Sequence, residues 1–165
     1  MQERHVNGKR VLRALALGVA IALAAVLALG NNIGYGRTLH AVSSRTIEVV
    51  EHAITDTENP GVNGADVKGN ILTFNNPVYN VKNTRKVGHD EGFCTRLAPT
   101  QGIWECLWTT FIKGGQLTVQ GPYYDKRNSV LSITGGTGAY RNSRGQMKLV
   151  SRENGKEYDF IFELS

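Results

Sequence analysis

The 165-residue sequence is poor in the residues that build metal sites and nucleotide sites. It contains two cysteines and four histidines, and the histidines are scattered along the chain at positions 5, 40, 52 and 89. Too few candidate ligands lie together to predict a metal centre. No glycine-rich loop precedes a helix and a Walker-type lysine, which excludes a phosphate-binding loop. We therefore expect neither a metal nor a cofactor.

The sequence also has little excess positive charge outside its N-terminal segment. The chain has 19 Lys and Arg against 14 Asp and Glu, for a net charge of +5. Residues 1–30 hold four of these basic residues and one acidic residue, so the remainder is left with a net charge of only +2. A nearly neutral body of this kind does not predict a nucleic-acid-binding surface.

The first thirty residues are dominated by an apolar run that follows a basic start. Residues 14–30 carry no charged side chain and end in small residues before Asn31. This order is typical of a secretory signal peptide, although residues 11–30 are also almost long enough to span a bilayer. Residues 1–30 are therefore interpreted as a signal peptide, a membrane anchor or a hydrophobic helix packed as a lid. The first two predict a secreted or membrane-anchored protein, and the third a cytoplasmic one.

Short β-branched and aromatic runs dominate the rest of the chain, at intervals of about 8–12 residues. Residues 31–44 are interpreted as a linker, and Thr57–Gly64 as a long loop. The predicted strands are Thr46–Ile54, Val67–Phe74, Tyr79–Val87, Phe93–Leu97, Ile103–Ile112, Gln116–Gly121, Val130–Thr134, Gln146–Ser151 and Tyr158–Leu164. This pattern predicts an all-β fold over residues 45–165, a closed antiparallel up-and-down barrel of about eight strands. A barrel of that size can hold one small ligand in its lumen.

The two cysteines, Cys94 and Cys106, are placed symmetrically about a predicted turn. Their midpoint is residue 100, within the segment Pro99–Gly102. In a hairpin centred there the two side chains lie opposite each other, where Cβ atoms approach closely. This spacing makes a disulfide possible if the protein is exported.

Five motifs between residues 69 and 149 carry a family resemblance. They are Gly69–Tyr79 (GNILTFNNPVY), Gly92–Cys94 (GFC), Gly115–Tyr123 (GQLTVQGPY), Ile133–Tyr140 (ITGGTGAY) and Gly145–Leu149 (GQMKL). Together they resemble the allene oxide cyclase family and, more distantly, the plant dirigent proteins that share its barrel. The resemblance covers roughly residues 45–164, and it implies the same barrel with a ligand site inside it.

The resemblance also implies particular site residues. The glutamate that assists cyclisation in the family matches Glu48, although Val50 replaces the neighbouring asparagine that holds a water there. Other family cavity positions match five residues: Pro60, Phe74, Asn76, Cys94 and Tyr123. In the family the position of Cys94 is a free thiol facing the cavity, so a disulfide and a free thiol remain alternatives.

Two predicted strands add further candidates through their alternation. Gln116, Thr118 and Gln120 share one face, opposite Leu117 and Val119. If this polar stripe faces the lumen, it would orient a substrate and leave the two apolar residues for a subunit interface. If it faces outward, it would only be solvated. In the predicted strand 103–112, Ile103 and Glu105 share one face, opposite Trp104, Cys106 and Trp108. The predicted catalytic residues are Glu48, Asn76 and Gln116. The predicted substrate-binding residues are Pro60, Phe74, Cys94, Ile103, Glu105, Thr118 and Tyr123.

A site without a triad or a metal suits chemistry that depends on positioning. Holding the two reacting ends of one molecule together removes much of a barrier, and one carboxylate or amide adds electrostatic stabilisation. We expect a cofactor-free cyclase that acts on a small apolar polyunsaturated substrate, and a homo-oligomer (dimer or trimer). The resemblance implies a [4+2] cyclisation of a polyketide, as in the similar bacterial spirotetronate cyclases, or an allene oxide cyclase-type isomerisation of an oxidised fatty acid. A non-enzymatic, dirigent-like binding barrel is the alternative.

Overall fold

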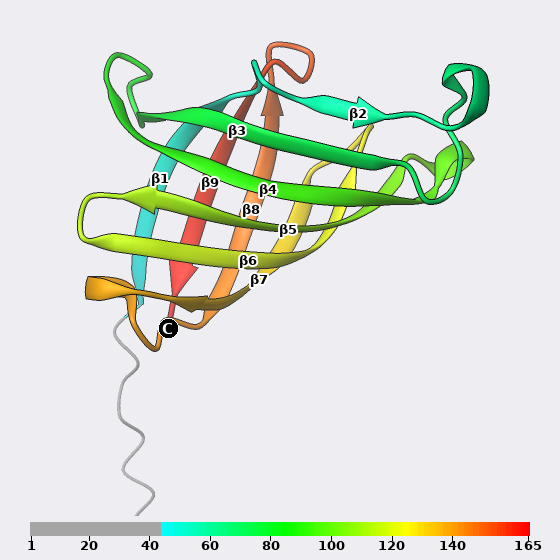
Figure 1. The fold of residues 1–165 in the computed structure, drawn as a ribbon. Coiled ribbons are helices and arrows are strands. Elements are labelled where there is room, and N and C mark those ends of the chain that lie inside the picture. Colours follow the sequence, from blue (N-terminus) through cyan, green and yellow to red (C-terminus); the bar gives the residue numbers. More distant parts are fainter. Residues whose placement is uncertain (1–43) are drawn as a thin grey trace, which may run out of the picture. The chain divides into compact units, whose positions relative to one another are not determined.

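Eight antiparallel strands close into a barrel in the computed structural model, which describes residues 44–165 (Figure 1). The barrel strands are β1 (Arg45–His52), β3 (Ile71–Asn80), β4 (Lys86–Ala98), β5 (Ile103–Ile112), β6 (Gly115–Tyr124), β7 (Ser129–Gly136), β8 (Gly145–Arg152) and β9 (Glu157–Leu164). A ninth, short strand is β2 (Thr57–Asn59). From β3 to β9 each strand pairs with the next, and β1 pairs with both β9 and β3 to close the ring. The short β2 pairs with β3 only. The predicted all-β barrel is confirmed.

Alternating side chains define the inside of the barrel. In β9, for example, Tyr158, Phe160, Phe162 and Leu164 are buried, whereas the residues between them are half-buried. Because successive side chains of a strand point to opposite faces, one face of each strand lines the lumen. Phe160 and Phe162 are almost completely buried and belong to one continuous apolar core inside the barrel.

The strand boundaries differ from the prediction between residues 57 and 87. The Asn-Asn-Pro segment at 75–77 was expected to separate two strands, but it lies within β3. The edge of β3 that faces away from β4 has no strand partner between Thr73 and Val78, and proline is tolerated at such an edge. The turn instead follows Asn80, whose side-chain Oδ1 accepts hydrogen bonds from the backbone N–H groups of Thr84 and Arg85. The segment predicted as a long loop contains β2.

The predictions for the N-terminus fall outside the described residues. These are the signal peptide, anchor or lid helix at 1–30 and nearly all of the linker at 31–44. Within residues 44–165, no helix is long and apolar enough to cross a membrane.

Candidate functional site

A cavity of about 60 Å³ opens within the barrel. Its lining residues come from β1, β3–β6, β8 and β9 and from the segment after β1: Glu51, Asp56, Leu72, Phe74, Cys94, Cys106, Trp108, Tyr123, Leu149, Tyr158 and Phe160. The aromatic wall is continuous, because the ring centroids of Phe74 and Phe160 lie 6.1 and 5.5 Å from that of Trp108. Gly92 makes room for this wall, since a Cβ atom there would lie 2.3 Å from Cβ of Trp108. The enclosed space is smaller than most ligand pockets, so a larger ligand must extend through the mouth.

The two cysteines form a disulfide that is part of the cavity wall. Cys94 and Cys106 are directly paired across β4 and β5, with their Cα atoms 4.0 Å apart. The hairpin geometry expected from the sequence is confirmed, and of the two alternatives the disulfide is correct. The free thiol implied by the family resemblance is therefore absent at Cys94.

Removing this disulfide should destabilise the barrel. The bond cross-links residues 12 apart in sequence, and constraining a loop of that length contributes about 3 kcal/mol. We expect the double substitution Cys94→Ala/Cys106→Ala to lower the free energy of unfolding by this amount in urea titrations. Wild-type protein in reducing agent should lose as much, whereas the variant should be insensitive to the reductant. A wild type that is unaffected by reduction would contradict this assignment.

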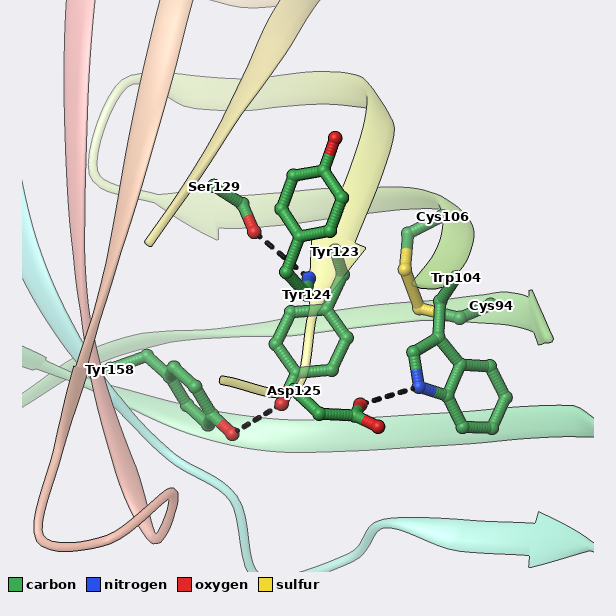
Figure 2. The surroundings of a disulfide bond; sticks show 8 residues. All are labelled: Cys94, Trp104, Cys106, Tyr123, Tyr124, Asp125, Ser129 and Tyr158. Atoms are coloured by element: carbon green, nitrogen blue, oxygen red, sulfur yellow. Dashed lines mark hydrogen bonds between the residues drawn. A yellow bond between two sulfur atoms is a disulfide. The ribbon is translucent and has the colours of Figure 1, made fainter. Parts of the chain in front are cut away.

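Two tyrosines stand at the edge of the cavity. The hydroxyl groups of Tyr123 and Tyr158 are hydrogen-bonded at 2.9 Å (Figure 2). Both residues also line a second pocket, here called the outer basin, whose other lining residues include Lys126 and Arg127. Burial is the main cause that raises the pKa of both phenols. They therefore remain protonated hydrogen-bonding groups at neutral pH, between the cavity and the basin.

Arg96, two residues after Cys94 on β4, is a buried arginine whose guanidinium is paired with two carboxylates. Arg96 donates hydrogen bonds to Asp66 (2.8 Å) and Asp125 (2.7 Å), and its guanidinium lies 3.8 Å from the ring centroid of Trp104. The indole N–H of Trp104 donates to the same Asp125 (Figure 2). Each polar group of this cluster is thus paired, and Arg96 is not free to bind an anionic ligand.

The polar side of the cavity is built around Asn76. Its Nδ2 donates hydrogen bonds to Glu51 and Asp56, each at 2.7 Å. Its Oδ1 accepts from the backbone N–H groups of Ile54 and Thr55 and from the Thr55 hydroxyl, at 2.8–3.1 Å. Asn76 therefore fixes the segment 54–56 and orients two carboxyl groups at the cavity, and it has no side-chain N–H left to bind a ligand.

Glu51 has a second acidic neighbour, Asp90, on β4. Asp90 is completely buried and its Oδ1 accepts a hydrogen bond from the backbone N–H of Asn76. Burial is the largest cause that raises the pKa of Glu51 well above its usual value, and the charge of Asp90 raises it further. Burial likewise raises the pKa of Asp90 to about 7. At neutral pH the pair therefore retains a proton close to the cavity.

This pair makes the stability of the protein depend on pH. Between about pH 4 and pH 7 the folded protein holds protons that the unfolded chain has released, so the free energy of unfolding falls as the pH rises. Asp90→Asn should remove one such group and flatten the fall by up to about 1.4 kcal/mol per pH unit. Urea titrations at pH 4.5, 6 and 7.5 measure this slope. Glu91→Gln, which alters the exposed neighbour on the same strand, should leave it unchanged; equal slopes for Asp90→Asn and wild type would refute the interpretation.

Three of the predicted site residues line the cavity, and one lies directly behind it. Phe74, Cys94 and Tyr123 are in the lining, and Asn76 supports Glu51 from behind. Asn76, predicted as a catalytic residue, instead positions the carboxyl groups of Glu51 and Asp56.

The other predicted residues do not line this cavity. Glu48 is exposed on β1, and Pro60 is exposed after β2. In β6 the completely buried residues are Leu117 and Val119, which places Gln116 and Thr118 on the outer face. The predicted subunit interface on Leu117 and Val119 is therefore wrong.

The predicted site residues of β5 also lie on the outer face of the barrel. Trp104, Cys106 and Trp108 are buried in the core, so Ile103 and Glu105 lie on the opposite, outer face. Both faces of β5 carry apolar residues, so composition alone does not decide which face of β5 is buried. In β6 the more apolar face points inward, as in an ordinary core, and the prediction reversed this preference by placing the polar stripe of that strand in the lumen.

Several lining residues were not among the predicted site residues: Glu51, Asp56, Leu72, Cys106, Trp108, Leu149, Tyr158 and Phe160. Glu51 carried a usable signal, because it shares the face of Ile47 and Val49, the apolar side of the first strand. An acidic residue on the apolar side of a strand is a better candidate for a buried site than Glu48.

Three buried polar atoms have no hydrogen-bond partner within residues 44–165: Asp90 Oδ2, the indole nitrogen of Trp108 and Thr110 Oγ1. Asp90 and Thr110 are directly paired across β4 and β5. Buried polar groups are usually satisfied, so unused hydrogen-bonding capacity lies next to the carboxyl pair. In the same part of the chain, no group of three or more His, Cys, Asp or Glu side chains is arranged to hold a metal ion.

The described residues thus form a closed β-barrel with an aromatic, partly polar cavity. The family model described as allene oxide cyclase matches residues 45–153, which is more than half of the chain. The chain therefore belongs to the allene oxide cyclase family, as the sequence motifs predicted.

Solved structures share the fold at low sequence identity. A pyocyanin demethylase has a TM-score of 0.64 and 20% identity, covering 73% of this chain and 100% of that one. The pterocarpan synthase dirigent protein GePTS1 has a TM-score of 0.61 and 16% identity, covering 73% and 82%. AbnU, an exo-specific intermolecular Diels–Alderase, has a TM-score of 0.59 and 16% identity, covering 74% of this chain and 98% of that one. These similarities show that the chain shares its barrel fold with these proteins.

Proposed function

We propose that this protein is a cyclase that folds a small apolar polyunsaturated substrate inside the barrel, by a [4+2] or related cyclisation. The observation that carries the proposal is the carboxyl group of Glu51 in a cavity otherwise lined mainly by aromatic and aliphatic side chains. The aromatic wall of Phe74, Trp108 and Phe160 provides a surface on which a flexible polyene can bind in a folded conformation. Bringing its reacting ends together lowers the entropic part of the barrier.

Glu51 supplies the polar part of this chemistry. Because the buried pair with Asp90 retains a proton at neutral pH, Glu51 can donate a hydrogen bond to a substrate carbonyl. Such a bond withdraws electron density from the alkene conjugated to that carbonyl and stabilises the charge that develops there in the transition state. In a [4+2] reaction the two π bonds of a diene and the π bond of an alkene are consumed, two C–C σ bonds and one new C=C π bond form, and no atom is gained or lost.

The test uses a linear probe in which a conjugated diene and an α,β-unsaturated ketone are joined by a flexible chain. The expected product has the same mass as the probe, a different retention time and no diene absorbance. Liquid chromatography with mass spectrometry measures its rate of formation with and without protein. Equal rates with and without protein, across probes of several chain lengths, would oppose the proposal.

The second candidate is a dirigent-like barrel that binds and orients a ligand without catalysis. The small enclosed volume of the cavity favours it, because much of a ligand would remain outside. Saturable binding of the polyene probes, with no acceleration of their cyclisation, would select this candidate.

A further inference from the structure

The charges around the cavity point to a ligand class beyond the proposed cyclisation. Five lining residues have aromatic rings, and two, Glu51 and Asp56, have carboxyl groups. Among the described lining residues there is no Lys, Arg or His. We propose that this cavity binds an aromatic cation, such as an N-alkylated heteroaromatic ring, with its positive charge beside Glu51 and Asp56.

The two carboxyl groups are held where they can act on one charge. Both accept a hydrogen bond from the same Nδ2 atom of Asn76, each at 2.7 Å. Asp56 is exposed at the mouth, whereas Glu51 is only 5% exposed. A cation between them would lie close to the carboxylate oxygens of both residues and would relieve the repulsion between their negative charges.

The aromatic wall complements the rest of such a ligand. Phe74, Trp108 and Phe160 pack edge-on or tilted against each other and line the same cavity. Aromatic faces attract cations, and the attraction grows when water is excluded.

Basic groups near the cavity do not counter this preference. Arg96 is already paired with Asp66 and Asp125. Lys126 and Arg127 lie in the outer basin beyond the tyrosine pair, and Arg127 stacks on the ring of Tyr124 at 3.7 Å. A carboxylate in the cavity would therefore face Glu51 and Asp56 without a described counterion.

Cation binding should be linked to proton release. The groups that face Glu51 are Asp56, Asp90, the Asn76 amide and the phenols of Tyr123 and Tyr158. A bound cation favours the ionised form of Glu51 and displaces the proton that the Glu51–Asp90 pair retains. The affinity for a cation should consequently rise with pH around and above neutrality, whereas that for a neutral ring should not.

The experiment compares three aromatic probes of similar size: N-methylquinolinium (cation), quinoline (neutral at pH 8) and 1-naphthoate (anion). Isothermal titration calorimetry of the full chain at pH 8 should show N-methylquinolinium binding about tenfold more tightly than quinoline, and no binding of 1-naphthoate. Repeating the titration in phosphate and in Tris should give different apparent enthalpies, which reveals the released proton. Equal affinities for cation and neutral ring, tighter binding of the anion, or no binding of the cation would overturn the inference.

Variants locate the effect. Glu51→Gln and Asp56→Asn should each weaken N-methylquinolinium binding and leave quinoline binding unchanged, whereas Glu48→Gln, on the exposed face of the same strand, should change neither. Unaltered cation affinity in both of the first two variants would also overturn the inference. The inference uses the same cavity as the proposed function, but the titration needs no turnover. Cation selectivity without cyclisation would refute the cyclase and support the binding site, and cyclisation without cation selectivity would do the reverse.

Discussion

Glu51→Gln should slow cyclisation of the diene–enone probe by about tenfold, because an amide N–H is a weaker hydrogen-bond donor than a carboxyl O–H and about 1.4 kcal/mol of lost transition-state stabilisation is a factor of ten in rate. Glutamine keeps the shape of the side chain and an oxygen that can accept the hydrogen bond from Asn76 Nδ2. Its amide N–H can still donate a hydrogen bond to the substrate carbonyl, but it polarises that carbonyl less than a carboxyl O–H does. The rate of product formation at saturating probe measures the effect.

The sequence offers a matched control three residues away. Glu48→Gln makes the same chemical change on the exposed face of β1, so it should leave the rate at the wild-type value. Circular dichroism and thermal melting should show both variants folded. Wild-type turnover in Glu51→Gln would remove Glu51 from the mechanism, and a loss in Glu48→Gln alone would restore the residue that the family resemblance implied.

Asn76→Ala should destabilise the protein by roughly 3–5 kcal/mol, the usual cost of leaving buried polar and charged groups without partners. The substitution removes two donors from Glu51 and Asp56 and one acceptor from the segment 54–56. It also leaves a space in a completely buried position. Urea titration at pH 7 measures the loss.

Asn75→Ala is the corresponding control, because Asn75 is the exposed neighbour on the same strand. Its side chain makes one long hydrogen bond, 3.4 Å, to Glu91, so its loss should change stability by less than about 0.5 kcal/mol. If the two variants were equally stable, the network drawn around Asn76 would be incorrect.

The sequence predicted the barrel well because its signal is repeated along the chain. Each strand alternates apolar and polar residues, and turn-forming residues separate the strands at short intervals. The break expected at Asn75–Pro77 failed because those residues were judged by local turn preference. Their place in β3 depends on an edge left unpaired between β2 and β1, which only the closed sheet determines.

The site was predicted less well, for two physical reasons. Parity within a strand is visible in sequence, but which face turns inward depends on the neighbouring strands. Placing polar Gln116 and Thr118 in the lumen reversed the ordinary preference that buries Leu117 and Val119. The role of Asn76 also required contacts with Glu51, 25 residues earlier, and with the segment that follows it.

The amide of Asn76 couples the ionisation of Glu51 to the ordering of the segment 54–56. It touches Glu51 with its nitrogen and the segment 54–56 with its oxygen, so the charge on Glu51 and the closure of that segment act on the same side chain. Linkage requires such effects to be reciprocal. If ionisation of Glu51 strengthens the contacts of Asn76, then ordering of the segment 54–56 lowers the pKa of Glu51 by the same free energy. A ligand that orders the mouth of the barrel would thereby also set the protonation state of the acid inside it.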